Sequence, residues 1–305
     1  MSEGAGRTGG LLLVHAHPDD ETITTGATMA HYAARGVPVT LLTCTLGEEG
    51  EILVPGYAQL EAAQADQLGG LRIGELAAAM RALGVTDHRF LGGAGRFRDS
   101  GMLGTPANDH PRAFWRAERD ARVFDAAVAA AVAVVREVRP RVVVTYDPAG
   151  DYGHPDHVMA HRVATAAVER AGHPAYGTCT PWHVAKTYWT ATRASDLDRD
   201  AQAVAASPEL PFRADPQARG VPDDAVTTTV DAGAFLAAKA AALAAHRTQV
   251  VVDGAFYALS NLIGRQISAV EHYRLASGSM GVERDAAGHE PDLFAGLSGA
   301  REVGR

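Results

Sequence analysis

Residues 11–21, with the sequence LLLVHAHPDDE, constrain the fold of this chain most strongly. The apolar half of the stretch is typical of a short strand buried on both faces, as in a parallel sheet. Pro18 ends the extended run and suits the first turn of a helix. His17 and Asp20 are three residues apart, so in a helical turn their side chains point the same way. The stretch therefore predicts half of a divalent-metal site, with Asp19 left beside the metal for proton transfer.

A second stretch repeats this pattern far along the chain. Residues 141–147 (RVVVTYD) are strand-like and lead through a loop into the HPDH sequence of residues 154–157. Ligands bind to open parallel sheets in the crevice outside the carboxyl ends of the strands. Two such loops facing one crevice predict a metal site made of His17, Asp20 and His157, with one position open. The alternative is two ordinary helix starts with capping aspartates; the repetition of the pattern weakens it.

Such a ligand set suits hydrolysis of an amide. A metal with an open position lowers the pKa of a water towards ~7, and Asp19 is the candidate base for its attack on a carbonyl. Tyr152 and His154 are candidates for stabilising the negative charge of the tetrahedral intermediate, and His154 as imidazolium could also protonate the departing amine. The ligands alone do not fix the metal. One Zn²⁺ per chain is the first choice and Fe²⁺ the second.

Composition limits the class of protein. The chain has 305 residues, of which 47% are hydrophobic, enough for the core of a large α/β domain. A net charge of −8 argues against nucleic-acid and anionic-membrane partners. Cys44 and Cys179 are too few for a disulfide framework and favour the cytoplasm. We expect no signal peptide and no membrane-spanning segment. The oligomeric state stays open.

Strand-like runs alternate with helical segments, which predicts a Rossmann-like α/β fold with a mainly parallel sheet flanked by helices. We expect one domain over residues 1–305, in three parts: a core with the metal site over 11–172, a C-terminal region of strands, helices and an irregular cap or insertion over 173–275, and a poorly ordered tail over 276–305. Within the second part, residues 194–224 are expected to be irregular and residues 255–270 helical.

Other polar residues are ambiguous from the residues alone. Glu48, Glu49 and Glu51 follow the strand expected at residues 37–45, and solvated loop charges are the favoured interpretation over groups that bind substrate hydroxyls. Arg72 lies near a helix start, where a surface cation is the default. The long loop over residues 93–111, which carries Asp99, has a length that is often functional.

The HPDDE and HPDH sequences resemble the motifs of the zinc-dependent N-acetylglucosaminyl deacetylase family (PIG-L/LmbE-like). The segments TCTLGEEGE, LGGAGRFRDSGM and HRTQVVV are similar to the branch of that family that deacetylates N-acetylglucosaminyl-inositol in mycothiol biosynthesis. The resemblance covers most of residues 11–275 and is weak over residues 194–224.

The resemblance implies a Rossmann-like fold and a role for each of several residues. The implied zinc ligands are His17, Asp20 and His157, and the implied general base is Asp19. His154 would be the acid or the oxyanion donor, and Tyr152 would help to stabilise the oxyanion. The residues implied to contact the hydroxyls of the sugar–inositol substrate are Glu51, Arg72, Asp99 and His154. These implied roles replace the interpretations of Arg72 as a surface cation and of the glutamates as solvated loop charges.

Alternative functions remain. The mycothiol S-conjugate amidase shares the metal motifs, but its pattern has a lysine soon after HPDDE, where this chain has Thr22, Ile23 and Thr24. A deacetylase of another N-acetylglucosaminyl compound is a further possibility. A nucleotide- or sugar-binding module without catalysis would need a Gly-rich phosphate loop after the first strand, and the sequence there is HAHPDDE.

Overall fold

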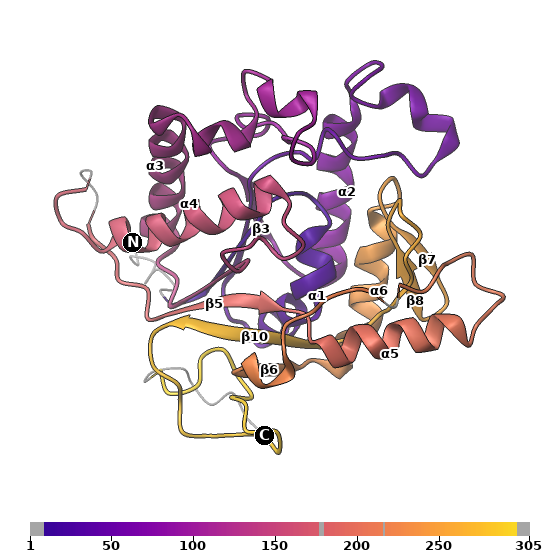
Figure 1. Ribbon diagram of the computed structural model, residues 1–305. Coiled ribbons are helices and arrows are strands. Elements are labelled where there is room, and N and C mark those ends of the chain that lie inside the picture. Colours follow the sequence, from indigo (N-terminus) through magenta and orange to yellow (C-terminus); the bar gives the residue numbers. More distant parts are fainter. Residues whose placement is uncertain (1–8, 177–179, 216, 298–305) are drawn as a thin grey trace, which may run out of the picture.

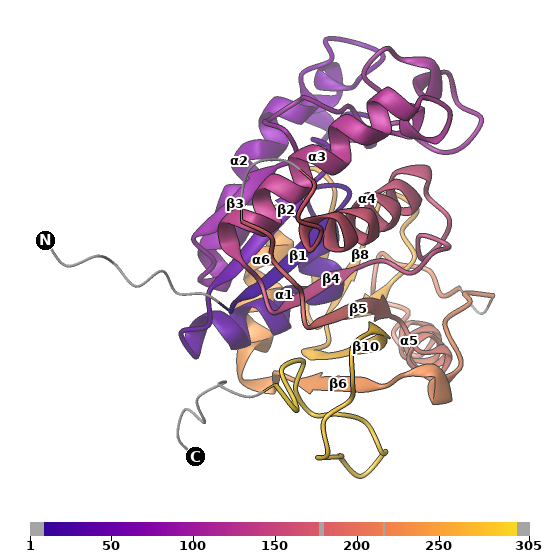
Figure 2. The ribbon, with the colours of Figure 1, turned by 90° about the vertical axis from the view of Figure 1, so that its left-hand side faces the viewer.

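The computed structural model describes residues 9–176, 180–215 and 217–297. In these residues the main sheet has seven strands in the order β3-β2-β1-β4-β5-β10-β6, which follow one another across Figure 2. Their bounds are β1 Leu11–His15, β2 Val39–Thr43, β3 Asp87–Phe90, β4 Val142–Thr145, β5 Lys186–Ala191, β6 Thr228–Asp231 and β10 Val270–Ser277. The strands from β3 to β5 are parallel, and β10 is antiparallel to β5 and β6. The predicted Rossmann-like, mainly parallel sheet is confirmed.

Helices cover both faces of this sheet (Figure 1). The α-helices are α1 Asp20–Ala34, α2 Leu68–Leu83, α3 Ala121–Val138, α4 Pro155–Ala171, α5 Ala194–Ala205 and α6 Leu236–Ala245. Short 3-10 helices are η1 Pro55–Leu60, η2 Pro106–Asp109, η3 Phe114–Glu118, η4 Asp223–Ala225 and η5 Gly233–Phe235. On β1, Leu11 and Leu13 pack into the core formed with α1, α2 and α6, whereas Leu12 and Val14 pack with α3 and α4. Alternate side chains of a strand point to opposite faces, so the continuous apolar run is explained by burial on both.

The order of the strands places the site. From β1 the chain moves outward through β2 and β3, and from β4 it moves the other way to β5. Strands β1 and β4 are direct parallel neighbours, with Leu11 paired with Val142 and Leu13 with Val144. The sheet therefore has its switch point between β1 and β4, which is where ligands bind in open α/β sheets. The HPDDE loop follows β1 and the HPDH loop follows β4.

Two expectations for the C-terminal region are wrong. The helix expected over residues 255–270 is instead part of a three-stranded antiparallel sheet, made of β7 Val251–Asp253, β8 Phe256–Ala258 and β9 Arg265–Gln266, beside α6 in Figure 1. Short apolar runs do not distinguish a helix from strands by their periodicity. The irregular insertion expected from residue 194 begins with α5, which buries only Leu197 and Val204. The apolar face of α5 is therefore too narrow to give a clear helical period in the sequence.

The expected poorly ordered tail is also wrong for the part of it that the structure describes; residues 298–305 lie outside that part. Glu290 and Leu293 are fully buried. The Glu290 carboxylate accepts hydrogen bonds from Lys186 Nζ at 2.7 Å and from the Tyr188 hydroxyl at 2.9 Å. The segment after β10 is therefore fastened to β5 by a buried ion pair.

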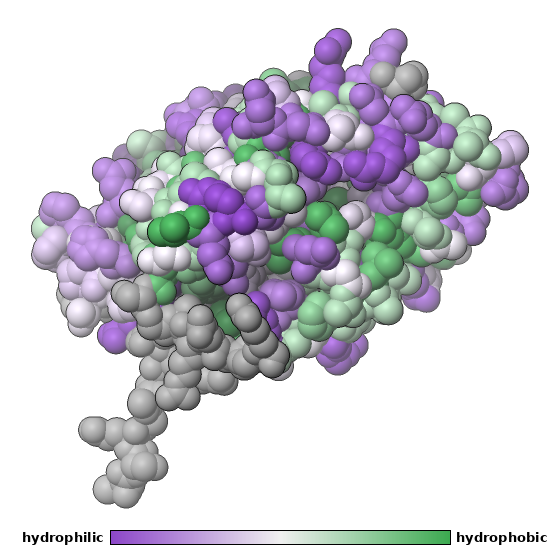
Figure 3. All heavy atoms as spheres, turned by 90° about the horizontal axis from the view of Figure 1, so that it is seen from below, coloured by the Kyte–Doolittle hydropathy of each residue, from purple (hydrophilic) through white to green (hydrophobic). Residues whose placement is uncertain are grey.

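None of the helices in the described ranges is both long and apolar enough to cross a bilayer. Figure 3, a view from below, shows hydrophilic and apolar residues together on the visible part of that face, with many of the apolar ones to the right of its centre.

Breaking the Lys186–Glu290 pair should destabilise the protein strongly. Replacing Glu290→Ala leaves the buried Lys186 ammonium without its carboxylate, and we expect the free energy of unfolding to fall by about 3–5 kcal/mol. Denaturant unfolding measures this change. The control is Asp125→Ala, which removes the exposed partner of Arg170 and should change stability by about 0–1 kcal/mol. Equal, small effects of both variants would contradict the assignment.

Candidate metal centre and active site

The first half of the site is the turn between β1 and α1. Asp19 is the N-cap residue of α1, and His17 and Asp20 lie on either side of it. The backbone N–H of His17 donates to Asp20 Oδ2 at 2.9 Å, and His17 Nδ1 lies 3.3 Å from the same oxygen. The turn that carries both residues directly follows β1, at the switch point of the sheet.

The second half is the start of α4. His154 is the N-cap residue and Pro155 opens the helix. His157 follows in the first turn and is 1% exposed. Its ring stacks on Tyr146, the aromatic residue just after β4, with centroids 4.2 Å apart. The helix start and this stacking fix the direction of the imidazole.

The two halves converge. His157 Nε2 lies 3.4 Å from Asp20 Oδ2, the oxygen that His17 also approaches. Ligand atoms of His17, His154 and His157 also lie within 4.8 Å of one another, as do those of His17, Asp99 and Asp156. The structure thus brings the predicted triad together and places further donors next to it. That His17, Asp20 and His157 are the ligands stays a prediction.

The environment of these residues fits a bound cation. Neither ring nitrogen of His157 has a hydrogen-bond partner among the described residues, although the ring is buried. Burial opposes ionisation of Asp20, but the His157 and His17 imidazoles hold the pKa of its carboxyl well below the usual range. Asp99 and Asp156 add buried carboxylates beside His17. Buried charges of one sign need pairing or a metal, so the donor set suits a divalent cation.

Asp156 is a site residue that the sequence did not single out. It is fully buried, and its Oδ2 accepts the backbone N–H of Ser100 at 2.9 Å and lies 3.3 Å from His17 Nε2. Metal-binding histidines usually donate their second N–H to a carboxylate, which fixes the ring. The signal that could have found Asp156 is its place between two histidines in HPDH.

Asp19 occupies a strained and tightly held position. Its φ of 122° is positive, which costs a residue with a side chain on the order of 1–3 kcal/mol. Arg72 Nη2 donates to Asp19 Oδ2 at 2.8 Å and also to the Pro18 carbonyl. Burial raises the pKa of the Asp19 carboxyl to about 6, against the opposing effect of Arg72. Such strain is typical of functional sites that the surrounding structure holds in place.

Comparison with known proteins gives the family. The family model described as "GlcNAc-PI de-N-acetylase" (PIG-L) matches residues 12–168, a range that holds both motifs. The chain belongs to the PIG-L family. It is similar to a protein of Geodermatophilus obscurus named 1D-myo-inositol 2-acetamido-2-deoxy-alpha-D-glucopyranoside deacetylase, with 59% identity over 95% of this chain and 98% of that protein. A protein of the same name from Acidothermus cellulolyticus is 56% identical, covering 94% of each chain.

Solved structures agree on the PIG-L-type fold. The N,N'-diacetylchitobiose deacetylase from Pyrococcus horikoshii has a TM-score of 0.52 at 18% identity, covering 78% of this chain and 69% of that one. The 4-carboxy-2-hydroxymuconate hydratase GalB of Pseudomonas putida has a TM-score of 0.55 at 17% identity, covering 91% and 100%. At this identity the likeness shows the fold alone, since one fold supports many functions.

The glutamate loop of this PIG-L chain is mostly structural. Glu48 is buried, and its Oε2 accepts the backbone N–H of Asp99 at 2.9 Å. Glu49 Oε1 accepts from Arg98 Nη2 at 2.8 Å. The interpretation of these two as solvated loop charges is therefore wrong, because each pairs with a loop far along the chain. Glu51 is exposed, and its contact with substrate stays a prediction.

Arg72 and Asp99 also lie beside the candidate metal centre. The default of a surface cation is wrong for Arg72, which is 3% exposed and donates from Nη1 to the Gly47 carbonyl at 2.7 Å. Asp99 is 4% exposed, and its Oδ1 lies 3.5 Å from His17 Nε2. No local pattern in the sequence predicts that Arg72 binds Asp19, because the pairing depends on how α2 packs against the turn after β1. Contacts of Arg72 and Asp99 with substrate stay predictions.

The two predicted oxyanion donors differ in burial. His154 is buried, and its Nδ1 accepts the backbone N–H of Asp156 at 3.1 Å. Burial, together with His17 and His157, lowers the pKa of His154 to about 3. Tyr152 is 63% exposed, with its ring centroid 5.0 Å from that of His157 and 6.1 Å from that of His154. Tyr152 thus stands at the rim of the site.

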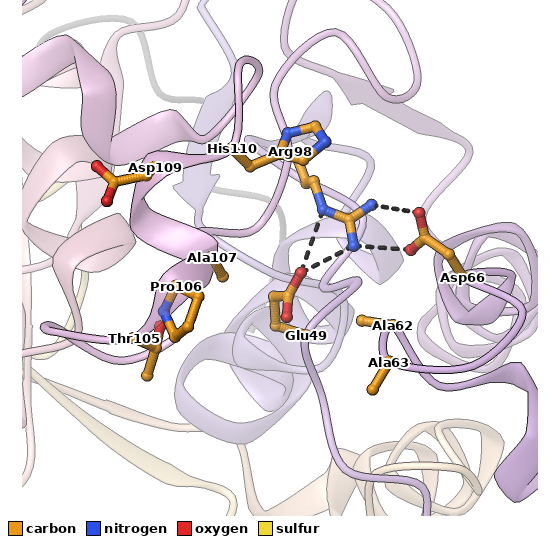
Figure 4. Close-up of a pocket in the computed structure, with 10 residues that line it drawn as sticks. All are labelled: Glu49, Ala62, Ala63, Asp66, Arg98, Thr105, Pro106, Ala107, Asp109 and His110. Carbon is orange, nitrogen blue, oxygen red and sulfur yellow. Dashed lines mark hydrogen bonds and ion pairs between the residues drawn. The ribbon is translucent and has the colours of Figure 1, made fainter.

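A pocket of about 590 Å³ adjoins this centre. Arg98, which precedes Asp99, reaches into it and binds Glu49 and Asp66 (Figure 4). The metal cluster does not line the pocket. The loop that carries Arg98 and Asp99 therefore links the pocket wall to His17.

Removal of a predicted ligand should remove the metal. We expect His157→Ala to lower metal affinity by more than the ~10–100-fold typical of losing an outer partner, because it removes a predicted direct ligand and not a group that only orients one. Metal content after dialysis against a chelator measures this. The control is His161→Ala, which removes a ring whose Nδ1 lies 2.9 Å from the Tyr146 carbonyl and should leave metal bound. Full metal content in His157→Ala would contradict the ligand assignment.

Proposed function

We propose that the protein is a metal-dependent N-deacetylase that hydrolyses the acetamide of 1D-myo-inositol 2-acetamido-2-deoxy-alpha-D-glucopyranoside, giving acetate and glucosaminyl-inositol, as in mycothiol biosynthesis. The observation that carries the proposal is a carboxylate, Asp19, held beside the cluster of His17, Asp20 and His157. The high identity to relatives that bear the name of this activity supports the substrate.

The proposed metal is one Zn²⁺ per chain, held by His17, Asp20 and His157, with Fe²⁺ as the second choice. A cation bound there supplies Lewis acidity that polarises the acetamide carbonyl and lowers the pKa of a water. The remaining steps depend on residues around it. Asp156 accepts from the His17 ring and keeps its other nitrogen directed at Asp20.

Asp19 is the proposed general base. Arg72 holds its Oδ2, which leaves the other carboxylate oxygen for a water. Burial raises the pKa of Asp19 to about 6 in the metal-free protein, so near neutral pH its carboxylate can take a proton from the attacking water and return it to the departing amine. A base is most effective when its pKa lies near the working pH.

His154 is the proposed oxyanion donor. Because its Nδ1 accepts a backbone N–H, the proton of the neutral ring is on Nε2, where it can donate to a developing negative charge. The lowered pKa supports this role over protonation of the amine by an imidazolium. Tyr152, at the rim beside His154, is the proposed second donor.

The substrate hydroxyls are assigned to Glu51, Arg72, Asp99 and His154. Of these, Asp99 and His154 lie next to His17, which suits contact with the sugar that carries the acetamide. Glu51 is exposed on the loop after β2, which suits contact with the more distant ring. We propose that the substrate is a small sugar–inositol molecule. We also propose that the protein acts in the cytoplasm, without a nucleic-acid or membrane partner.

Acetate release from N-acetylglucosaminyl-inositol tests the proposed function. We expect the metal-loaded protein to hydrolyse this compound faster than mycothiol S-conjugates and faster than N,N'-diacetylchitobiose. Faster turnover of a mycothiol S-conjugate would identify the protein as a mycothiol S-conjugate amidase. Turnover of none of these compounds would contradict the proposal.

Loss of the base should separate turnover from metal binding. Asp19→Ala removes the proton acceptor but not a predicted ligand, so we expect turnover to fall by about 10²–10⁴ while metal content stays at one ion per chain. Steady-state acetate release and metal analysis on the same sample measure both. A variant with nearly full activity would show that another group is the base.

A further inference from the structure

The backbone of Asp19 is held by a neighbour in the HPDDE motif. The Asp19 N–H donates to Glu21 Oε2 at 2.9 Å, across the turn in which Asp19 has its positive φ. Glu21 is fully buried although it lies in the first turn of α1. A carboxylate in that place needs partners, since an isolated buried charge is very costly.

His246 supplies that partner from the other end of the chain. Its Nε2 lies 2.9 Å from Glu21 Oε1, which also accepts the Thr22 hydroxyl at 2.6 Å. His246 is fully buried and ends helix α6. The two carboxylate oxygens of Glu21 therefore have separate tasks: one binds His246 and the other binds the Asp19 backbone.

The residues after His246 contact helix α2, which carries the arginine that binds the Asp19 side chain. Thr248 donates to the Glu75 carboxylate twice, from its backbone N–H at 3.0 Å and from its hydroxyl at 2.7 Å. Glu75 lies on α2, three residues after Arg72, whose guanidinium binds the Asp19 side chain. Segment 246–248 thus contacts both the group that holds the Asp19 backbone and the helix that holds its carboxylate.

We propose that His246 is a positioning residue for the base: through Glu21 it keeps the main chain of Asp19 in its strained conformation, with the carboxylate beside the metal ligands. His246 lies outside residues 12–168, where the family model matches. The inference rests on the proposed function, because its effect is measured as acetate release.

A purely structural role would also explain the buried His246–Glu21 pair. The test must therefore separate a structural role of His246 from a role in positioning Asp19. We expect His246→Ala to lower kcat by about 10–100-fold, the range for outer partners of a metal site, with KM little changed and metal content unchanged. The matched control is His272→Ala, which removes another buried histidine with a hydroxyl partner, Thr229, and a carboxylate partner, Asp196. This control should keep the wild-type kcat.

A double-mutant cycle with Asp19→Ala gives the sharper readout. If His246 acts through Asp19, then His246→Ala has no further effect on the residual rate once the Asp19 carboxylate is gone. An equal fold-loss in both backgrounds, a wild-type kcat in His246→Ala, or the same loss in His272→Ala would each overturn the proposal.

Conservative variants keep the test open if His246→Ala does not fold. The amide nitrogen of His246→Gln can take the place of Nε2 and donate to Glu21, whereas that of the shorter His246→Asn cannot reach it. We expect the Gln variant to be about tenfold faster or more than the Asn variant; equal rates would overturn the inference. Absence of acetate release by the wild-type protein would instead contradict the proposed function itself.

Discussion

Buried carboxylates around one imidazole are the constraint on which the rest of the site depends. Asp20, Asp99 and Asp156 all approach the His17 ring, at the point where the sheet reverses its strand order. Charges of one sign cannot be buried so close together without compensation. A divalent cation would supply it and would use the His157 ring, whose nitrogens have no hydrogen-bond partner among the described residues. In this account the metal site is the electrostatic centre of the fold as well as its reactive centre.

The parts of the site that the sequence predicts are those whose geometry is local. A strand that runs into HPDDE or HPDH fixes where the loop points, because a buried strand and the first turn of a helix leave few directions open. The roles of Arg72, Glu48 and Asp156 do not follow from the sequence, for the opposite reason. Their roles depend on contacts with Asp19, Asp99 and His17, across elements whose packing no local pattern reveals.

The C-terminal region shows the same limit for the fold. Helix α5 was not predicted because only one narrow stripe of it is buried, and the strands around β8 have apolar runs too short to show a period. The segment after β10 was expected to be poorly ordered from its glycines, yet a single buried carboxylate, Glu290, fastens it to β5. For this last segment a long-range contact decides the structure, not a local preference.

Anomalous diffraction from a zinc-loaded crystal, collected on both sides of the zinc absorption edge, would locate the metal and identify its ligands. We expect one peak per chain at about 2.0–2.2 Å from a ring nitrogen of His17, a carboxylate oxygen of Asp20 and a ring nitrogen of His157. A peak between His17, Asp99 and Asp156 instead, or a peak on neither set, would contradict it.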